Sequence, residues 1–428
     1  MGLARGRSTP SPLNLPVACF GRPVCRLQPS RYSLHKRNEN MKSIELFAGA
    51  GGLGLGLHSA GFVPVKVVEW NRDCCETIRH NRNSAHSKVS EWNLIEGDVR
   101  GIRFCDLQGK IDLVSGGPPC QPFSLGGKHL AYDDSRDMFP QAIRAVREVK
   151  PRAFVFENVK GLTRSAFRNY FEYIKLQLEH PELQATEDED WSEHLARLEQ
   201  HHTKGLRDGL HYQVVARVLN AANYGVPQKR ERVLFVGFRD DLHVEWSFPS
   251  ETHSLDALIW DQVITGEYWE RNQVPKSQRI VNERFKSRAA KIVERPLCKP
   301  WRTVRDALAK LPDPERKPSA CKQFSNHRFQ PGARSYPGHT GSPFDEPAKT
   351  LKAGVHGVPG GENMLLRSDG TVRYFSVRES ARLQTFPDDY FFTGCWSEAM
   401  RQIGNAVPVR LSGAIGEGVA NKLNSLPA

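Results

Sequence analysis

A single cysteine, Cys120, lies in a stretch of chain whose backbone has little freedom. Residues 116–124 around it read GGPPCQPFS. The three prolines of this stretch each fix the backbone angle φ near about −65°, so the sulfur is held at a nearly constant angle. A nucleophile that must meet its target in one geometry needs such a frame. A buried thiol that merely packs beside a proline turn is the alternative, and this stretch alone favours it.

A glycine-rich loop forms a second group of chemically useful residues. Gly49, Gly51 and Gly54 have the spacing G-x-G-x-x-G, which permits a tight turn and the close approach of a ligand to the backbone. Glu69 lies 20 residues after Gly49, where an acid can accept hydrogen bonds from ribose hydroxyls. The pattern predicts an adenosine-containing cofactor, and it does not separate a nicotinamide from S-adenosylmethionine.

Two further acids follow expected strands. Asp98 could accept a hydrogen bond from an adenine amino group, although an ordinary turn aspartate would look the same. Glu157 directly follows the apolar run 153–156. Downstream, residues 228–232 read QKRER, in which arginines at alternate positions can face one way and grip phosphate or a base edge. Four charges in a row also suit a solvated loop.

These residues require a particular set of elements to position them. The apolar pattern predicts strands at 43–47, 63–68, 111–114, 153–156, 211–219 and 232–238. Helices are expected from Asn71 to about Arg82 and from about 139 to 149, and a capping box at Ser376 and Glu379 starts another. The alternation predicts a doubly wound α/β sheet that binds ligands at the carboxyl ends of its strands. The glycine loop, Glu69, Asp98, Cys120 and Glu157 all fall at such ends.

Other stretches depart from this pattern. Residues 1–40 carry seven basic residues and one acid, which suits a disordered tail or a start site placed too early better than an organellar transit peptide. Residues 163–210 are expected to form a mostly helical, solvated insertion. From about 241 to 371, glycine, proline, basic and aromatic residues are interleaved, which indicates a loop-rich module suited to a groove of DNA.

Composition limits the partners and the compartment. The 428 residues include 60 Lys and Arg against 48 Asp and Glu, and the formal charge of +12 suits a polyanionic partner. Nine scattered cysteines without a Cys-x-x-Cys pair favour neither a disulfide framework nor a zinc knuckle, so no metal site is expected and a reducing compartment is. No stretch approaches the ~18 apolar residues of a membrane helix, so no membrane partner is expected.

Eight blocks of the chain, in order, resemble the motifs of the cytosine-5 DNA methyltransferases of the bacterial type found in restriction–modification systems. They contain the glycine loop, the proline-framed cysteine and the QKRER stretch. The resemblance runs from about 41 to 428 and leaves 163–210 outside. The eight blocks are residues 47–52, 69–70, 97–99, 118–124, 157–159, 228–232, 378–387 and 404–408.

The resemblance implies methyl transfer from S-adenosyl-L-methionine to carbon 5 of a cytosine flipped out of duplex DNA. Cys120 is then expected to add to carbon 6 as a thiolate, and Glu157 to serve as an acid at ring nitrogen 3. The positions expected to hold the base are Arg232, with Arg230 and Gln228 in support. The expected cofactor-binding positions are Phe47, Gly49, Gly51, Gly52, Leu53, Glu69, Trp70, Asp98, Pro118 and Asn405.

The expected fold class is therefore α/β, with a Rossmann-like methyltransferase domain at 41–240 plus 372–428. Residues 241–371 are expected to form a smaller, loop-rich target-recognition domain. The expected partner is double-stranded DNA, with a cognate restriction endonuclease as a possible separate partner, and the chain is expected to be a monomer in the cytoplasm beside the nucleoid.

Three rival functions share part of this pattern. A transfer-RNA cytosine methyltransferase would share the catalytic blocks, but the 241–371 module argues against it. A non-catalytic DNA-binding relative has no need for both Cys120 and Glu157. A nicotinamide dehydrogenase fits only the glycine loop and does not explain the proline-framed cysteine.

Overall fold

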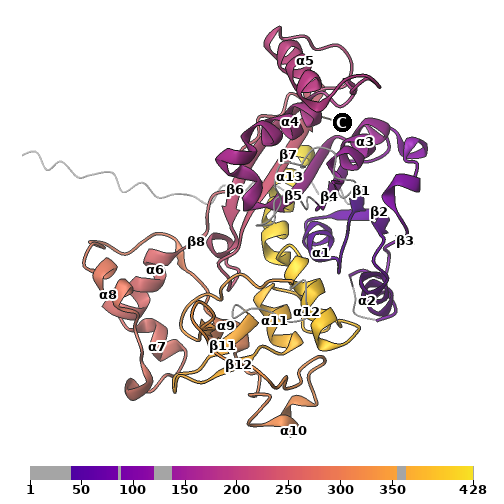
Figure 1. Cartoon of the computed structure of the whole chain (residues 1–428). Coiled ribbons are helices and arrows are strands. Elements are labelled where there is room, and N and C mark those ends of the chain that lie inside the picture. The colour runs from indigo at the N-terminus through magenta and orange to yellow at the C-terminus, as the bar shows by residue number, and fades with distance from the viewer. Residues whose placement is uncertain (1–39, 85–87, 120–136, 354–362, 428) are drawn as a thin grey trace, which may run out of the picture. The chain divides into compact units, whose positions relative to one another are not determined.

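A seven-stranded sheet forms the centre of the computed structural model, which describes residues 40–427 apart from 85–87, 120–136 and 354–362 (Figure 1). Its strand order is β3-β2-β1-β4-β5-β7-β6. The strands β3, β2, β1, β4 and β5 run parallel to one another, whereas β7 is antiparallel to both of its neighbours, β5 and β6. The strands are β1 Met41–Leu46, β2 Phe62–Glu69, β3 Leu94–Glu96, β4 Leu113–Gly116, β5 Ala153–Val159, β6 Tyr212–Asn220 and β7 Glu231–Arg239.

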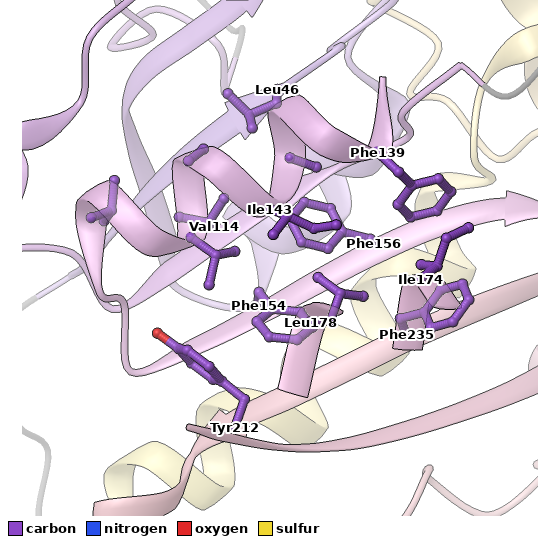
Figure 2. Packing of buried hydrophobic residues seen from close by; sticks show 14 of the residues in the cluster. Leu46, Val114, Phe139, Ile143, Phe154, Phe156, Ile174, Leu178, Tyr212 and Phe235 are labelled. Carbon is purple, nitrogen blue, oxygen red and sulfur yellow. The ribbon is translucent and has the colours of Figure 1, made fainter. Parts of the chain in front are cut away.

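The central strands are buried on both faces, as expected where helices cover both sides of a parallel sheet. In β5, Phe154 and Phe156 face one side, where they pack with α3 (Phe139–Val149) and α4 (Arg168–Glu179). Figure 2 shows this packing around Phe139, Ile174 and Phe235. Ala153 and Val155 face the other side and pack with α1 (Gly52–Ser59) and α13 (Val409–Asn424). The doubly wound α/β architecture predicted from the sequence is confirmed.

Local sequence signals set several helix ends. The Asn71 side chain accepts a hydrogen bond from the Cys74 amide and starts α2 (Arg72–Arg82), as predicted. Ser376 and Glu379 form the predicted capping box of α11 (Val377–Leu383).

The remaining helical elements of this part are one α-helix and several short 3-10 helices. The α-helix is α12 (Trp396–Asn405). The 3-10 helices among the described residues are Val99–Gly101, Cys105–Leu107, Lys160–Thr163, Ser165–Phe167, Ala221–Tyr224, Asp240–Leu242 and Lys276–Gln278.

The predicted solvated insertion at 163–210 is only partly an insertion. Its first helix, α4, buries Ile174 and Leu178 in the main core, so α4 is part of the α/β layer. Its second helix, α5 (Trp191–Thr203), packs its buried leucines, Leu195 and Leu198, against Leu176 of α4 in a small satellite cluster. The expectation was wrong for α4, because its apolar face covers the sheet.

Residues 241–371 form short elements, as a loop-rich module would. The helical ones are α6 Leu255–Ile259, the π-helix Trp260–Ile264, α7 Glu267–Arg271, α8 Glu283–Ala289, α9 Val304–Leu308 and α10 Pro318–Cys321. The strands form one pair, β8 His253–Ser254 with β9 Lys299–Pro300, and one three-stranded sheet, β10 Ser342–Pro343, β11 Met364–Leu366 and β12 Val372–Tyr374.

The module has two kinds of core. Its first part closes around Leu258, Tyr268 and Trp269 in a cluster that also holds Ala222 of the α/β layer. Its second part instead shares a core with the α/β layer, where Leu351 and Leu365 belong to one cluster with residues that include Ala48, Leu55 and Trp92. The boundary predicted at 371 falls between β11 and β12, which are paired, so the structure does not divide the chain there. From Asn40 onward the described chain is one compact unit.

The composition favoured neither a disulfide framework nor a membrane helix. Their six cysteines are all free thiols. No helix in the described part of the chain is both long and apolar enough to cross a membrane.

Candidate active site

A buried ion pair lies at the carboxyl end of β5. Strand pairing places Glu157 of β5 beside the start of β7, and the Arg232 Nε lies 2.7 Å from the Glu157 Oε1. The two side chains are 13% and 10% exposed. Burial raises the pKa of Glu157, and the positive charges of Arg232 and Arg230 oppose that rise. Burial also lowers the pKa of Arg232. The site thus holds a carboxyl group that keeps its proton to a higher pH than an exposed glutamate does.

The loop that leads to Cys120 begins against this glutamate. A Cβ on Gly117 would lie 3.2 Å from Glu157 Oε2, so a residue with a side chain would crowd the carboxylate. The Asn158 side-chain amide donates a hydrogen bond of 3.0 Å to the carbonyl of Pro118, which ties the loop to the end of β5. Pro119 is the last described residue here, and Cys120 itself lies outside the described residues.

The glycine loop between β1 and α1 is closed on one side and open on the other. Gly51 has φ +83°, and a Cβ there would come within 2.9 Å of Trp92. A Cβ on Gly52 would come within 2.4 Å of the Val407 carbonyl oxygen. Gly49 has φ +55°, yet a Cβ there would meet no described atom within 4 Å. Packing therefore requires glycine at the two inner positions, and the outer position leaves the backbone accessible to a ligand.

Glu69, at the end of β2, supports this loop. Its two carboxylate oxygens accept hydrogen bonds of 2.7 Å from the backbone amides of Gly49 and Asn71. Each oxygen has a second lone pair, so the carboxylate can still accept from a hydroxyl. The next residue, Trp70, is 73% exposed, which is unusual for an indole and leaves its face free for stacking.

The remaining predicted cofactor residues surround the same edge of the sheet. Phe47 follows β1 with a left-handed φ of 53°, and Leu53 is buried in α1. Asp98 follows β3, and its carboxylate is held by the Arg100 guanidinium, which lowers the pKa of Asp98. Asn405 is exposed at the end of α12. Asp98 is thus already paired, whereas Asn405 is accessible.

Two predicted base-holding residues serve a different purpose in this structure. Arg230 is fully buried and donates hydrogen bonds to the carbonyls of Leu351, Gly404 and Ala406. Gln228 is also fully buried, and it accepts from the Leu351 amide. The expectation that Arg230 reaches phosphate or base is corrected by these contacts, because its guanidinium already ties three segments of the chain together.

The sequence did not indicate the other side chains that join these segments. Gln384 donates hydrogen bonds to the carbonyls of Ile403 and Ala406. The Tyr390 hydroxyl donates a hydrogen bond of 2.8 Å to the Ala50 carbonyl of the glycine loop. A Cβ on Gly404 would lie 2.4 Å from the Ala353 amide nitrogen, so this glycine admits the neighbouring segment. The residues that these hydrogen bonds join are up to 340 positions apart in the sequence, so no local spacing indicates them.

Comparison with known proteins identifies the family of the chain. The family model for C-5 cytosine-specific DNA methylases matches residues 41–182 and 197–421. The chain belongs to this family. It is therefore a DNA cytosine-5-methyltransferase, and only residues 183–196 interrupt the match, not the whole of 163–210 as expected.

Curated relatives include bacterial type II methyltransferases. M.PspPI of Psychrobacter sp. (strain TA137) is 34% identical over 94% of this chain and 82% of its own length. M.Eco47II of Escherichia coli is 33% identical over 90% of this chain and 79% of its own. Among solved structures, the Dnmt2 methyltransferase of S. pombe superposes with a TM-score of 0.52 at 18% identity, covering 90% of this chain and 99% of that one. This last likeness shows the fold alone.

Proposed function

We propose that this methyltransferase acts on a cytosine flipped out of duplex DNA, through a covalent bond to Cys120, with S-adenosyl-L-methionine as methyl donor. The observation that carries the proposal is the position of Gly117, at the start of the loop that leads to Cys120, where a Cβ would lie 3.2 Å from Oε2 of the buried Glu157. Neighbouring strand ends can bring a nucleophile and an acid to the same ring, and β4 and β5 are neighbours.

The residues present fit the proposed cofactor. Gly49 leaves the loop backbone accessible, Glu69 keeps free lone pairs for hydroxyls, and Trp70 exposes its ring face. We infer that these residues and Phe47 hold the adenosine part, with Pro118 and Asn405 beside the methyl-bearing end. When bound, S-adenosyl-L-methionine supplies an electrophilic methyl group. Asp98 is paired with Arg100, so it would bind an adenine amino group only through its remaining lone pairs.

The chemistry of the base explains the residue types. Carbon 5 of cytosine is a poor nucleophile, so addition of the Cys120 thiolate to carbon 6 must first push electrons towards carbon 5. Glu157, with its raised pKa, would give a proton to ring nitrogen 3 as that nitrogen becomes more basic. Arg232 would orient the Glu157 carboxyl and help to hold the base. Carbon 5 would then take the methyl group from the donor. Loss of the carbon 5 proton to a base and cleavage of the sulfur–carbon bond would release the methylated cytosine and the Cys120 thiolate, and ring nitrogen 3 would return its proton to Glu157.

The same proposal assigns the read-out of DNA sequence to the 241–371 region. Each good bidentate contact to a base edge contributes about 1–3 kcal/mol of discrimination. Arg328, Arg334 and Lys352 are all exposed there, as base or phosphate contacts must be. We further propose that the chain works as a monomer and that a restriction endonuclease of the same specificity is a separate chain, because the curated relatives are type II methyltransferases.

Bisulfite sequencing tests the proposed substrate. Unmethylated plasmid DNA is incubated with the purified chain and S-adenosyl-L-methionine, and an RNA transcript of the same sequence is treated in parallel. We expect protected cytosines at one short sequence in the duplex and none in the RNA. Protection confined to the RNA would overturn the proposal that the substrate is DNA. Protection without the added methyl donor would overturn the proposal that S-adenosyl-L-methionine is the cofactor.

A further inference from the structure

Four histidines gather away from the active site, where α4 and α5 end and β6 begins. His180 directly follows α4, His201 and His202 occupy the last turn of α5, and His211 precedes β6. The three elements meet in space although their histidines are spread along the sequence. The ring of His180 lies 4.9 Å from that of His201 and 4.7 Å from that of His211, measured between centroids.

The ring geometry lets three nitrogens converge on one point. The His201 and His211 rings are nearly parallel, at 9°, and the His180 ring stands at 84° and 88° to them. One ligating atom from each of His180, His201 and His211 lies within 4.8 Å of the other two. Three imidazole nitrogens at such distances can close on a tetrahedral ion with small side-chain movements, because zinc–nitrogen bonds are about 2.0–2.1 Å long.

Two of these histidines have a buried nitrogen that no hydrogen bond satisfies. His180 is 7% exposed, and its Nδ1 has no hydrogen-bond partner. The Nε2 of His211 is likewise buried without one. Buried polar atoms in native proteins are nearly always paired, so each such atom requires an explanation.

We propose that His180, His201 and His211 bind a divalent transition-metal ion, Zn²⁺ being favoured. Imidazole nitrogen suits Zn²⁺, Cu²⁺ and Ni²⁺, and three histidines leave one tetrahedral position for water. The ion would clamp the end of α5 to α4 and to the edge strand β6. Such a clamp has a physical purpose here, because α5 has only a small apolar cluster of its own. The site would be separate from methyl transfer.

A second set of ligands, Glu179, His180 and His202, is spatially possible but less suited. In that set His180 Nε2 and His202 Nδ1 already lie 3.3 Å apart in a hydrogen bond. Glu179 Oε2 has no hydrogen bond, yet it lies 3.3 Å from His202 Nδ1, and its other oxygen is paired with Lys175 at 3.3 Å. His202 is also exposed. The neighbouring positions 201 and 202 therefore offer a matched pair of variants.

Metal binding is tested on the full chain, purified without a histidine tag and stripped by a chelator. Zn²⁺ is added by equilibrium dialysis, and bound metal is measured by elemental analysis for the wild type, His201→Ala, His211→Ala and His202→Ala. We expect one ion per chain in the wild type and His202→Ala. We expect affinity at least about tenfold weaker in the other two variants, because each loses a direct ligand. Added Zn²⁺ should raise the midpoint of thermal unfolding only where binding is retained.

Several outcomes would overturn the proposal. A wild-type chain that takes up no stoichiometric Zn²⁺ has no such site. Binding that survives His201→Ala and is lost in His202→Ala would assign the ion to Glu179, His180 and His202 instead. If an alanine variant fails to fold, the visible spectrum of the Co²⁺-loaded wild type still decides, because nitrogen-rich tetrahedral coordination is expected and an octahedral spectrum contradicts it.

Discussion

Glu45 and Glu157 are both buried on the central sheet, and their surroundings give them different tasks. Glu45, on β1, is 2% exposed and accepts a hydrogen bond from the Ser115 hydroxyl, with no cation beside it among the residues that the structure describes. Glu157 is paired with Arg232. Burial raises the pKa of both carboxyls, that of Glu45 to about 8. At the scale of single residues, the group beside each carboxyl therefore distinguishes the two glutamates. Glu45, beside a hydroxyl, is a structural carboxylic acid, and Glu157, beside a guanidinium, is the one that we assign to catalysis.

The pKa of Glu45 predicts how stability depends on pH. The folded-state pKa of Glu45 lies above the ordinary value of 4.5. The stability that its protonated carboxyl contributes to the fold is therefore fully present below pH 4.5 and is lost as pH rises through about 8. Glu45→Gln cannot ionise and should be more stable than the wild type at pH 9 by a few kcal/mol, with a smaller difference at pH 6. Denaturant unfolding at the two pH values measures this. The exposed Glu91→Gln is the control, and equal pH dependence in the wild type and Glu45→Gln would contradict the prediction.

Glu157→Gln tests the proposed acid. Glutamine keeps an oxygen that can accept from Arg232, but it cannot give a proton to the base. The single-turnover methylation rate should fall by at least about 100-fold. The wild-type rate should also decrease at alkaline pH as Glu157 loses its proton, and this decrease should be absent from the residual activity of the variant. Glu231→Gln, whose exposed carboxylate pairs with Lys160, should keep near wild-type rates. A Glu157→Gln enzyme within a few-fold of wild type would refute the role.

At the scale of elements, a buried polar network joins β7 to the last helices. Arg230 and Gln228 precede β7, and they hold the segment at Leu351 as well as the end of α12. The proposed cofactor residue Asn405 belongs to that helix end. The network thus holds the proposed base-binding and cofactor-binding edges together, so its loss should affect both folding and activity.

Arg230→Met should show that this residue is a brace. Three buried carbonyls would lose the Arg230 donor, and that of Ala406 would keep only the Gln384 amide. We therefore expect the free energy of unfolding to fall by about 2–5 kcal/mol. Lys229→Met, at the exposed neighbouring position, should change it by no more than about 0.5 kcal/mol. Urea unfolding of the two variants gives both values. If Arg230→Met were as stable as Lys229→Met and bound DNA with a smaller salt dependence, Arg230 would instead contact phosphate.

The sequence predicted most elements and few of their distant contacts. Helices α2 and α3 begin and end where the caps and apolar periods indicate, because those signals are local. The alternation in 228–232 predicted that Arg230 and Arg232 share one side, and the charges of both oppose the rise in the pKa of Glu157, a neighbour that the pattern did not name. It could not show that Arg230 meets carbonyls 121 to 176 residues away. The histidine cluster was missed for the same reason, since only the His201–His202 pair is local.

At the scale of the whole molecule, the predicted modules turned out to share a core. Irregular composition at 241–371 indicated a separate unit, because proline, glycine and charge normally mark loops. Its second half nevertheless buries Leu351 and Leu365 in a cluster with Ala48 of the glycine loop. Burial between segments so far apart depends on long-range packing, which period and composition do not report.

The net charge of +12 predicts how DNA binding depends on salt. Phosphate contacts release counterions, so the logarithm of the binding constant should fall linearly with the logarithm of salt concentration. Replacing the exposed Arg334 by alanine should reduce that slope by about one if it contacts phosphate, and should relax sequence preference if it contacts a base. Fluorescence anisotropy on specific and unrelated duplexes measures both. A flat response in the wild type would remove the electrostatic part of the proposal.

The central claim is that Cys120 attacks the target cytosine, and covalent trapping tests it most directly. A duplex with 5-fluorocytosine at the methylated position is incubated with the chain and S-adenosyl-L-methionine, then resolved under denaturing conditions. Fluorine cannot leave carbon 5 as a proton would, so elimination stalls and the bond to sulfur persists. We predict a protein–DNA adduct for the wild type and for Cys105→Ala, and none for Cys120→Ala. An adduct that forms with Cys120→Ala would contradict the account.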